Sequence, residues 1–217
     1  MTSAINYNIF GHLVFFIHQN IMGLAVRVGL RVAAILTCLT VISGNAQAAG
    51  HVYLLKGLFG VFSTGLITLA SELQKRGYTA TVHESGEYAT LALEASRLQK
   101  SGKGPIIIIG HSIGANAAIL MAEKMESEGA SVALIMGFGP TNDMLVPSNV
   151  SRAIIYYQTG AIVTGTAKKG PGFHGSLSNI NLLSDSDINH FNIEKIERLH
   201  AKAIAAVGTI AGRGHSP

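Results

Sequence analysis

The feature that most constrains this chain is a serine framed by two glycines, between an apolar run and an alanine-rich segment. Residues 110–114 read GHSIG and directly follow the run PIIII at 105–109. A run of consecutive β-branched residues is typical of a strand buried on both faces, as in the centre of a parallel sheet. The segment 113–127 predicts a helix. The two glycines allow a sharp turn from this strand to this helix, and such a turn would hold the Ser112 hydroxyl exposed above the carboxyl ends of the strands.

Predicted strands and helices alternate along the chain after residue 50. Alternation at a spacing of about 10–15 residues predicts βαβ units, and so an α/β fold with a mostly parallel central sheet and helices on both faces. We expect one domain over 49–211, without a large cap domain, and a frayed tail at 212–217. The expected strands are 51–55, 78–83, 105–109, 131–136, 150–157 and 177–183, and the expected helices lie within 63–77, 88–100, 113–127 and 193–207.

Composition and motifs argue against several classes of function. Apolar residues make up 48% of the chain and charged residues 13%, which excludes an intrinsically disordered protein. The net charge is +4 without a basic stripe, so we expect no nucleic-acid partner. No H-E-x-x-H or paired-cysteine spacing is present, so we expect no metal. The first predicted strand-to-helix loop, KGLFGVFSTG, lacks G-x-G-x-x-G, so we expect no dinucleotide cofactor.

The first 48 residues have the pattern of an export signal. Arg27 and Arg31 precede an apolar core at 32–42, and an A-x-A cleavage signal ends at Ala48. The apolar core has 11 residues, whereas a bilayer-spanning helix needs about 20. We therefore expect residues 1–48 to be an N-terminal extension plus a signal peptide, with Met22 as the true start and an exported, periplasmic or secreted product. The alternative is an uncleaved N-terminal anchor, which would be the protein's one contact with a membrane.

A serine hydroxyl becomes a good nucleophile when a base accepts its proton, so the histidines were compared by position. His190 lies between the last predicted strand and the last predicted helix, which places it on a loop at the same sheet edge as Ser112. His174 is an alternative base. His111 lies inside the GHSIG turn, and we expect its side chain to point away from that of Ser112.

These features resemble the α/β-hydrolases, and in particular small bacterial serine hydrolases of the esterase, lipase or thioesterase kind. The resemblance covers about residues 51–207. It rests on LLKGLFG at 54–60 as an oxyanion loop, on GHSIG, and on His190 followed by phenylalanine before the last helix. It implies that Ser112 is the nucleophile and His190 the base. It also implies that the backbone N–H groups of Ile113 and of Leu58, or alternatively Phe59, form the oxyanion hole.

The resemblance leaves the acid of a catalytic triad open. The family usually carries its acid in the loop that corresponds to 158–176, and this loop has no Asp or Glu. Asp143 follows the first strand beyond the nucleophile, where some members of the family place the acid, and is the main candidate. Asp185 and Asp187 are alternatives, and so is a Ser-His dyad without a carboxylate.

The sequence therefore predicts a serine hydrolase that cleaves a small-molecule ester or thioester through an acyl-Ser112 intermediate. Two alternatives remain open. One is a non-catalytic relative that keeps the fold and binds an acyl or envelope component. The other is an acyltransferase, since a second acceptor can replace water without a visible change in sequence.

Overall fold

The computed structural model describes residues 50–58, 63–160 and 163–213, with the side chains described up to residue 210. All of these residues belong to the unit Gln47–Pro217. The predicted signal peptide and the predicted start at Met22 lie outside the described residues, and so does Phe59, the alternative oxyanion donor.

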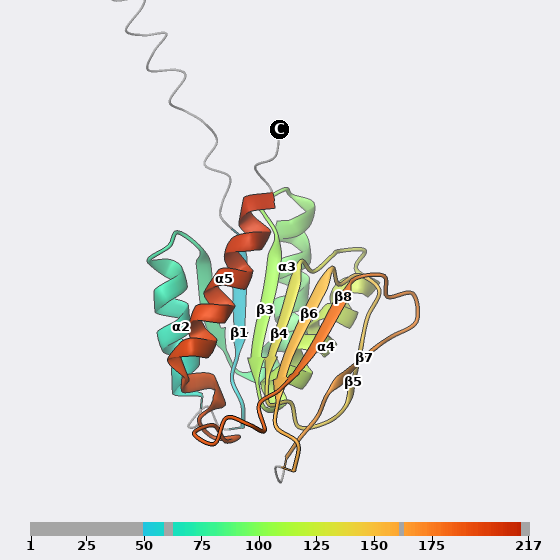
Figure 1. The fold of residues 1–217 in the computed structure, drawn as a ribbon. Coiled ribbons are helices and arrows are strands. Elements are labelled where there is room, and N and C mark those ends of the chain that lie inside the picture. The colour runs from blue at the N-terminus through green and yellow to red at the C-terminus, as the bar shows by residue number, and fades with distance from the viewer. Residues whose placement is uncertain (1–49, 59–62, 161–162, 214–217) are drawn as a thin grey trace, which may run out of the picture. The chain divides into compact units, whose positions relative to one another are not determined.

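A six-stranded sheet forms the centre of the described fold, and every neighbouring pair of its strands is parallel (Figure 1). A separate two-stranded parallel sheet forms where short segments of two long loops, both later in the chain than Ser112, pair with each other. The large sheet has the order β2 (Thr79–His83), β1 (His51–Leu55), β3 (Ile106–His111), β4 (Leu134–Phe138), β6 (Arg152–Tyr157) and β8 (Ser176–Asn181), and the small sheet pairs β5 (Met144–Val146) with β7 (Ala167–Lys169).

Helices cover both faces of the large sheet. In Figure 1, α2 and α5 lie in front of the strands, and α3 and α4 lie behind them. The predicted α/β fold with a mostly parallel central sheet is therefore confirmed, and no large cap domain is apparent in the described residues. The helices are α2 (Thr64–Gln74), α3 (Tyr88–Lys100), α4 (Ile113–Ser127) and α5 (Glu197–Arg213), with short 3-10 helices η1 (Ser85–Glu87) and η2 (Ile193–Lys195).

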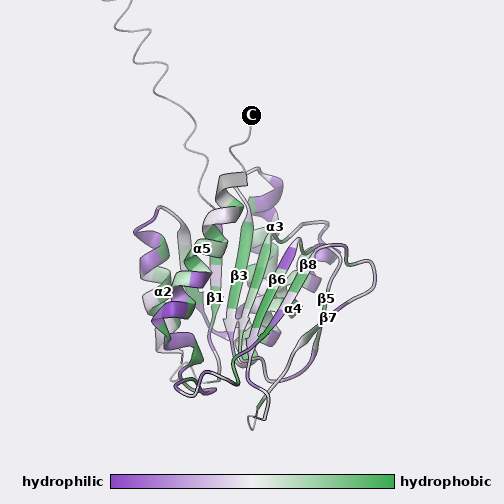
Figure 2. Ribbon diagram, viewed as in Figure 1, coloured by the Kyte–Doolittle hydropathy of each residue, from purple (hydrophilic) through white to green (hydrophobic). Residues whose placement is uncertain are grey.

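The isoleucine run explains why β3 occupies the middle of this architecture. Successive side chains of a strand point to opposite faces of the sheet. Ile106 and Ile108 accordingly belong to the core beneath α3 and α4, and Ile107 and Ile109 to the core beneath α2 and α5. All four are at most 1% exposed, and burying one such side chain stabilises the fold by about 1.5–3 kcal/mol. Figure 2 shows hydrophobic residues along these central strands.

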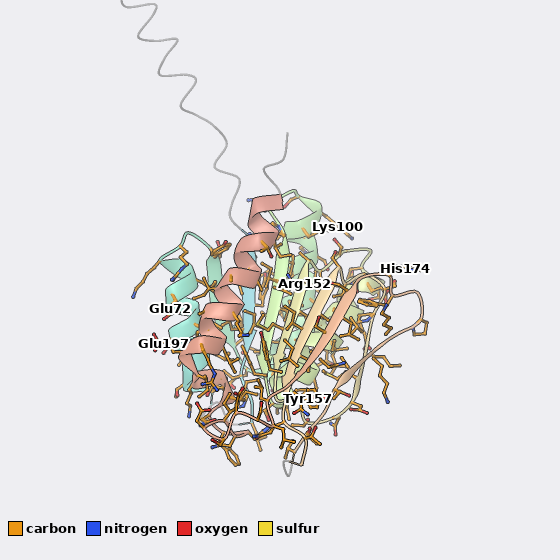
Figure 3. All side chains as sticks on the ribbon, in the orientation of Figure 1. Glu72, Lys100, Arg152, Tyr157, His174 and Glu197 are labelled. Carbon is orange, nitrogen blue, oxygen red and sulfur yellow. The ribbon has the colours of Figure 1, made fainter. Side chains whose placement is uncertain are left out.

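The strand register brings four loops to one edge of the sheet. Gly110 of β3 pairs with Leu55 of β1 and with Gly137 of β4, and Phe138 of β4 pairs with Tyr156 of β6. The carboxyl ends of these parallel strands are therefore level, and the loops that follow them are neighbours. In Figure 3, Tyr157 marks this carboxyl edge.

The structure differs from the sequence prediction mainly between the nucleophile and the last helix. The strand predicted at 131–136 begins and ends later, at Leu134–Phe138. The predicted loops 137–149 and 158–176 contain β5 and β7. The last predicted helix, 193–207, is divided into η2 and α5, and α5 extends to Arg213. In the part of the chain that the structure describes, no helix combines the length and the apolar character that crossing a membrane requires.

Candidate active site

The GHSIG motif forms a strained turn between β3 and α4. Ser112 has φ 56° and ψ −126°, and it is the one residue other than glycine with a positive φ among the described residues. Such a conformation costs about 1–3 kcal/mol and persists because the surrounding structure enforces it. Here the Ser112 N–H donates to the carbonyl oxygen of Phe138 at 2.9 Å, which ties the turn to the end of β4.

The two glycines of the motif are required by close backbone contacts. A Cβ atom at Gly110 would lie 2.2 Å from the carbonyl oxygen of Gly114, and one at Gly114 would lie 2.1 Å from the carbonyl oxygen of Leu55. No side chain fits at these distances. Strand β1, strand β3 and helix α4 therefore meet at a point where backbone packs on backbone, and this junction directs Ser112 toward the carboxyl edge.

His190 faces the serine from the loop between β8 and η2. The Ser112 Oγ lies 3.0 Å from the His190 Nε2, which is hydrogen-bond distance. Burial lowers the pKa of His190 below its ordinary value of 6.5, so the imidazole is neutral at pH 7. A neutral imidazole with its proton on Nδ1 accepts the serine proton at Nε2. This pair therefore has the geometry and the protonation state of a nucleophile and its base.

The structure does not bring Asp143 to this pair. The Asp143 Oδ1 accepts hydrogen bonds from the Thr166 N–H at 2.9 Å and the Thr166 Oγ1 at 3.0 Å, and its Oδ2 lies 3.5 Å from the Lys168 Nζ. These contacts lower the pKa of Asp143. Asp143 has this position because β5 pairs with β7, which places the start of β5 next to Thr166. This pairing was not predicted from the sequence. The prediction of Asp143 as the acid therefore finds no support in this geometry.

The other candidates from the sequence also lie elsewhere. Asp187 forms a two-pronged ion pair with Arg198, with distances of 2.8 and 3.0 Å, and Asp185 lies 3.6 Å from the same guanidinium group. His174, the alternative base, is exposed and comes two residues before Ser176, which pairs with Arg152 at the amino end of β6. Figure 3 shows His174 on the side of the sheet away from Tyr157.

The Nδ1 side of His190 packs against backbone. A Cβ atom at Gly139 would lie 3.1 Å from the His190 Nδ1, and Gly139 has a φ of +55°, which favours glycine. Among the described residues no carboxylate is hydrogen-bonded to this nitrogen. The shift in the pKa of His190 agrees, since its cause is burial, whereas a neighbouring carboxylate would raise the pKa. The described site is therefore a Ser-His pair.

The two predicted oxyanion donors, Ile113 and Leu58, follow Ser112 and Gly57 directly in the chain. Ile113 is the first residue of α4, so its N–H has no partner within the helix. Gly57 lies in the loop after β1, and a Cβ atom there would be 3.1 Å from the Ser112 Cβ, so the loop passes directly over the serine. The Gly57 N–H donates to the Ser63 Oγ at 2.8 Å and is therefore already engaged. The predicted donor Leu58 is the next residue, and the alternative donor Phe59 lies outside the described residues.

His111 has a role that its place in the motif did not reveal. Its side chain is 1% exposed, and its ring lies between Ser63 and the loop that carries His190. Burial lowers the pKa of His111 to about 4, so it is neutral at pH 7. In the sequence His111 looks like an ordinary residue of the GHSIG turn, because burial and hydrogen bonding to distant segments leave no local signal.

An apolar cavity of about 260 Å³ opens at the serine. Ser112 and His190 lie at its polar end, and Thr141 contributes a further hydroxyl. Leu58 is 56% exposed and Phe191 59% exposed, so both stand at the mouth of the cavity. The remaining wall is mainly apolar and includes Ile113 and Val163.

A second cavity of about 330 Å³ lies between α2 and the start of α5, and it differs in character. Glu72, Lys195, Glu197 and His200 line it, and Figure 3 shows Glu72 and Glu197 side by side. None of the predicted site residues lines this cavity. Within the described residues, no three His, Cys, Asp or Glu side chains are grouped so that they could hold a metal ion.

Comparisons by sequence gave no match, either to protein-family models or to curated proteins. Comparison of the structure found distant neighbours among lipolytic enzymes, thioesterases and esterases. One comes from work on LipS and LipT, two metagenome-derived lipolytic enzymes, with 11% identity, a TM-score of 0.48, and coverage of 75% of this chain and 95% of that chain. A second is the thioesterase domain SrfTE, linked to cyclization of the lipopeptide antibiotic surfactin, with 12% identity, a TM-score of 0.43, and coverage of 77% and 92%.

A third structural neighbour is an esterase from Pyrobaculum calidifontis, with 12% identity, a TM-score of 0.44, and coverage of 75% of this chain and 76% of that chain. At this identity and TM-score the likeness carries no information about activity or substrate.

Proposed function

We propose that this protein is a serine hydrolase that cleaves an ester or thioester of a small molecule through an acyl-serine intermediate. The observation that carries the proposal is the distance of 3.0 Å between the Ser112 Oγ and the His190 Nε2, at a strained turn that opens into an apolar cavity. Strain of this kind is retained where a side chain must be held in a reactive position.

Acylation follows from this geometry. The His190 Nε2 takes the proton of Ser112 as the Oγ attacks the substrate carbonyl carbon, and the carbonyl oxygen becomes an oxyanion. The N–H groups of Leu58 and Ile113 stabilise that charge, and a donor of this kind is worth about 3–4 kcal/mol in the transition state. As the tetrahedral intermediate collapses, the imidazolium gives its proton to the leaving group. The proton goes to the oxygen of an alcohol when the substrate is an ester, and to the sulfur of a thiol when it is a thioester. The product is acyl-Ser112 and a neutral imidazole.

Deacylation reverses these roles with water as the nucleophile. His190 accepts a proton from water while the oxygen attacks the acyl carbon, and the second oxyanion forms in the same hole. Collapse of this intermediate breaks the bond to the Ser112 Oγ, which takes the proton back from His190. The carboxylic acid leaves, and the enzyme returns to its starting protonation state.

Within the described residues no carboxylate contacts the His190 Nδ1, and this predicts a slow enzyme. In a catalytic triad the carboxylate keeps the imidazole in the correct tautomer and stabilises its charged form, and removing it costs about 10⁴ in rate. Burial favours the neutral base, so kcat/KM should rise with pH through a pKa below 6.5 and then reach a plateau. The fall on the acid side occurs because a protonated Nε2 cannot accept the serine proton.

The cavity favours substrates with a short apolar acyl group. Its volume of about 260 Å³ lies just below the range of about 300–1,000 Å³ that is usual for drug-sized ligands. A panel of p-nitrophenyl esters with graded acyl chains tests this directly. We expect the highest kcat/KM with short chains, and a preference for long chains would contradict the proposal.

One observation favours a second candidate function. The absence of a carboxylate at the His190 Nδ1 within the described residues fits a non-catalytic relative that keeps the cavity and binds an apolar acyl group. Such a protein would hold a fatty acid or ester without turning it over.

A fluorophosphonate probe separates the two functions, because it reacts with an activated serine and not with an ordinary one. We expect labelling of the wild-type protein, no labelling of Ser112→Ala, and labelling slower by about 10⁴-fold in His190→Gln, the upper range for loss of a general base. Exposed His174→Gln is the matched control and should label at the wild-type rate. A folded wild-type protein that is not labelled would contradict the enzyme and favour the binding protein.

We also propose that the protein is exported, as the charged, apolar and A-x-A segments before Ala49 indicate. Mass spectrometry of the mature product should find an N-terminus near Ala49. Intact Met1 or Met22 on that product would contradict export with cleavage.

A further inference from the structure

The site contains a chain of hydrogen bonds that the hydrolytic mechanism does not use. It consists of the Gly57 N–H, the Ser63 hydroxyl, the His111 ring and the main-chain carbonyl of His190, and we call it the buried bridge. Its distances are 2.8 Å from the Gly57 N to the Ser63 Oγ, 2.9 Å from the Ser63 Oγ to the His111 Nδ1, and 2.9 Å from the His111 Nε2 to the His190 O.

The partners fix the direction of every hydrogen bond in the buried bridge. The carbonyl oxygen of His190 can only accept, so the His111 Nε2 carries a proton and donates. A neutral imidazole has one N–H, so the His111 Nδ1 accepts from the Ser63 hydroxyl. The Ser63 Oγ in turn accepts from the Gly57 N–H. His111 is neutral because its pKa is lowered to about 4. Burial is the main cause, the hydrogen bond to the His190 carbonyl partly opposes it, and the charged forms of His190 and Lys195 add smaller lowering effects.

The buried bridge joins three segments that are far apart in the sequence and that all contribute to the site. Gly57 precedes the proposed oxyanion donor Leu58, His111 precedes the nucleophile, and the accepting carbonyl belongs to the base itself. Ser63 is 0% exposed and His111 is 1% exposed. Water therefore does not compete for the hydrogen bonds of Ser63, which are buried, and the hydrogen bond from His111 to the His190 carbonyl is partly shielded. Such hydrogen bonds constrain their segments more than exposed ones would.

Ser63 shows that the bridge takes precedence over local structure. It occupies the N-cap position of α2, where a serine side chain usually accepts a hydrogen bond from the first turn of the helix. Here its side chain makes no capping hydrogen bond and binds Gly57 and His111 instead. The start of α2 therefore lacks the usual N-cap hydrogen bond, and the Ser63 side chain connects Gly57 to His111 instead.

We propose that His111 is a positioning residue that, together with Ser63, holds the base and the oxyanion loop in their reactive arrangement. This inference rests on the proposed function. The bridge acts on the main chain of His190, whereas a triad acid acts on its imidazole, so the base is held in place without a carboxylate. His111 touches neither the transferred proton nor the oxyanion in this mechanism.

Substitutions at His111 can break the two halves of the bridge separately. The side-chain amide of His111→Asn lies near the place of Nδ1 and can still accept from Ser63, but it is too short to reach the His190 carbonyl. The longer amide of His111→Gln has its nitrogen near the place of Nε2 and can still donate to that carbonyl. His111→Leu introduces an apolar side chain of similar bulk, which makes neither hydrogen bond.

The experiment compares kcat per active site, counted by titration with the fluorophosphonate, so that misfolded protein does not contribute. A displacement of about 1 Å in a site can cost about 100-fold in rate, and we expect a loss of that size in kcat for His111→Leu and His111→Asn. His111→Gln keeps the bond to the base and should stay within about tenfold of wild type, the cost of one ordinary hydrogen bond. KM should change little in all three variants, because His111 lines the cavity but is only 1% exposed, so it offers almost no surface to a ligand.

The outcomes distinguish this inference from the proposed function. If the wild-type protein is not labelled at Ser112, both fail. If the wild-type protein is labelled but His111→Leu and His111→Asn keep the wild-type kcat per site, the positioning role alone is overturned. A residue with a merely structural role would lower the melting temperature and the number of active sites, and would leave kcat per site unchanged.

A measurement on the unsubstituted protein tests the bridge even if a variant fails to fold. The ¹⁵N chemical shifts of labelled histidine report which ring nitrogen carries the proton. We expect His111 to show the Nε2–H tautomer and to remain neutral down to about pH 5, since its pKa is about 4. An Nδ1–H tautomer, or titration near pH 6.5, would overturn the inference.

Discussion

Two clusters of polar side chains lie beside neighbouring strand ends in this molecule, and they differ in their exposure to water. In the buried bridge, the Ser63 and His111 side chains are at most 1% exposed. The cluster of Asp143, Thr166 and Lys168 beside the β5–β7 pair is open, with the Asp143 side chain 59% exposed and the Lys168 side chain 70% exposed. Both clusters are connected by hydrogen bonds of similar length.

The difference in burial gives the two clusters different consequences. An exposed ion pair contributes little because water and salt screen it and both side chains lose conformational freedom. A buried hydrogen bond is costly to break, because the groups left behind find no water. The cluster without a formal charge is therefore the one that can hold the catalytic groups in place. The charged cluster contains Asp143, the acid predicted from the sequence, but its exposed contacts constrain the catalytic groups little.

Among the substitutions that test this comparison, the largest effect on kcat/KM is expected at Gly139. Gly139→Ala places a Cβ atom 3.1 Å from the His190 Nδ1 and should push the imidazole away from Ser112. We expect kcat/KM to fall by about 10–100-fold, in line with a displacement of up to 1 Å. The positive φ should also destabilise the fold by about 1–2 kcal/mol.

Gly129→Ala is the matched control for Gly139→Ala. Gly129 has a φ of +69°, and a Cβ atom there would meet nothing within 4 Å. In denaturant unfolding, Gly129→Ala should lower the free energy of unfolding by an amount similar to that of Gly139→Ala. It should leave kcat/KM unchanged. Equal activity in the two variants would show that the base tolerates movement and would remove the contrast between the clusters.

Most of the fold could be predicted because it depends on local patterns. The isoleucine run identifies the central strand, and the predicted helices at 88–100 and 113–127 agree with the bounds of α3 and α4. The two strands of the small sheet were not predicted. Each has three residues and lies within a loop, so its pairing depends on contacts between segments about 20 residues apart and leaves no periodicity to detect.

The site was predictable to the extent that chain order determines it. Residues that follow parallel strands reach the same edge, so the proximity of Ser112 and His190 follows from their places after β3 and β8. Which way a loop side chain turns does not follow from chain order. Asp143 turns to Thr166 because β5 pairs with β7. His111 reaches Ser63 because Gly57 and Ser63 lie against the GHSIG turn.

Glu194 extends the comparison to a buried group that can carry a charge. Its side chain is 0% exposed beneath the start of α2, near the N–H groups of Gly65 and Leu66, yet neither carboxylate oxygen makes a hydrogen bond of good geometry with the described residues. Burial raises its pKa to about 7, against the effects of Lys195 and of these N–H groups.

Substitution of Glu194 by glutamine should therefore affect stability in a pH-dependent way. The native protein holds the Glu194 proton up to about pH 7, whereas the unfolded chain releases it near 4.5, so the free energy of unfolding falls as pH rises through this window. Glu194→Gln removes that loss. We expect it to be more stable than wild type by about 1–3 kcal/mol at pH 8 and nearly equal at pH 4.5. Exposed Glu197→Gln is the control in denaturant unfolding, and a larger gain at acid pH would contradict the assignment.

The smallest effect is expected at Asp143, and it tests the open side of the comparison. Asp143→Asn keeps the size of the side chain and an oxygen that can accept from Thr166, and it removes the attraction to Lys168. We expect unchanged kcat/KM and an unchanged pH profile. Loss of a true triad acid would lower kcat by about 10⁴-fold. A loss of that size, together with a shifted pH profile, would mean that the loop brings Asp143 to His190 during catalysis, and would make the exposed cluster the functional one. Lys168→Gln, which removes the other charge of the same pair and cannot serve as the acid, separates this outcome from a general effect on the β5–β7 pair.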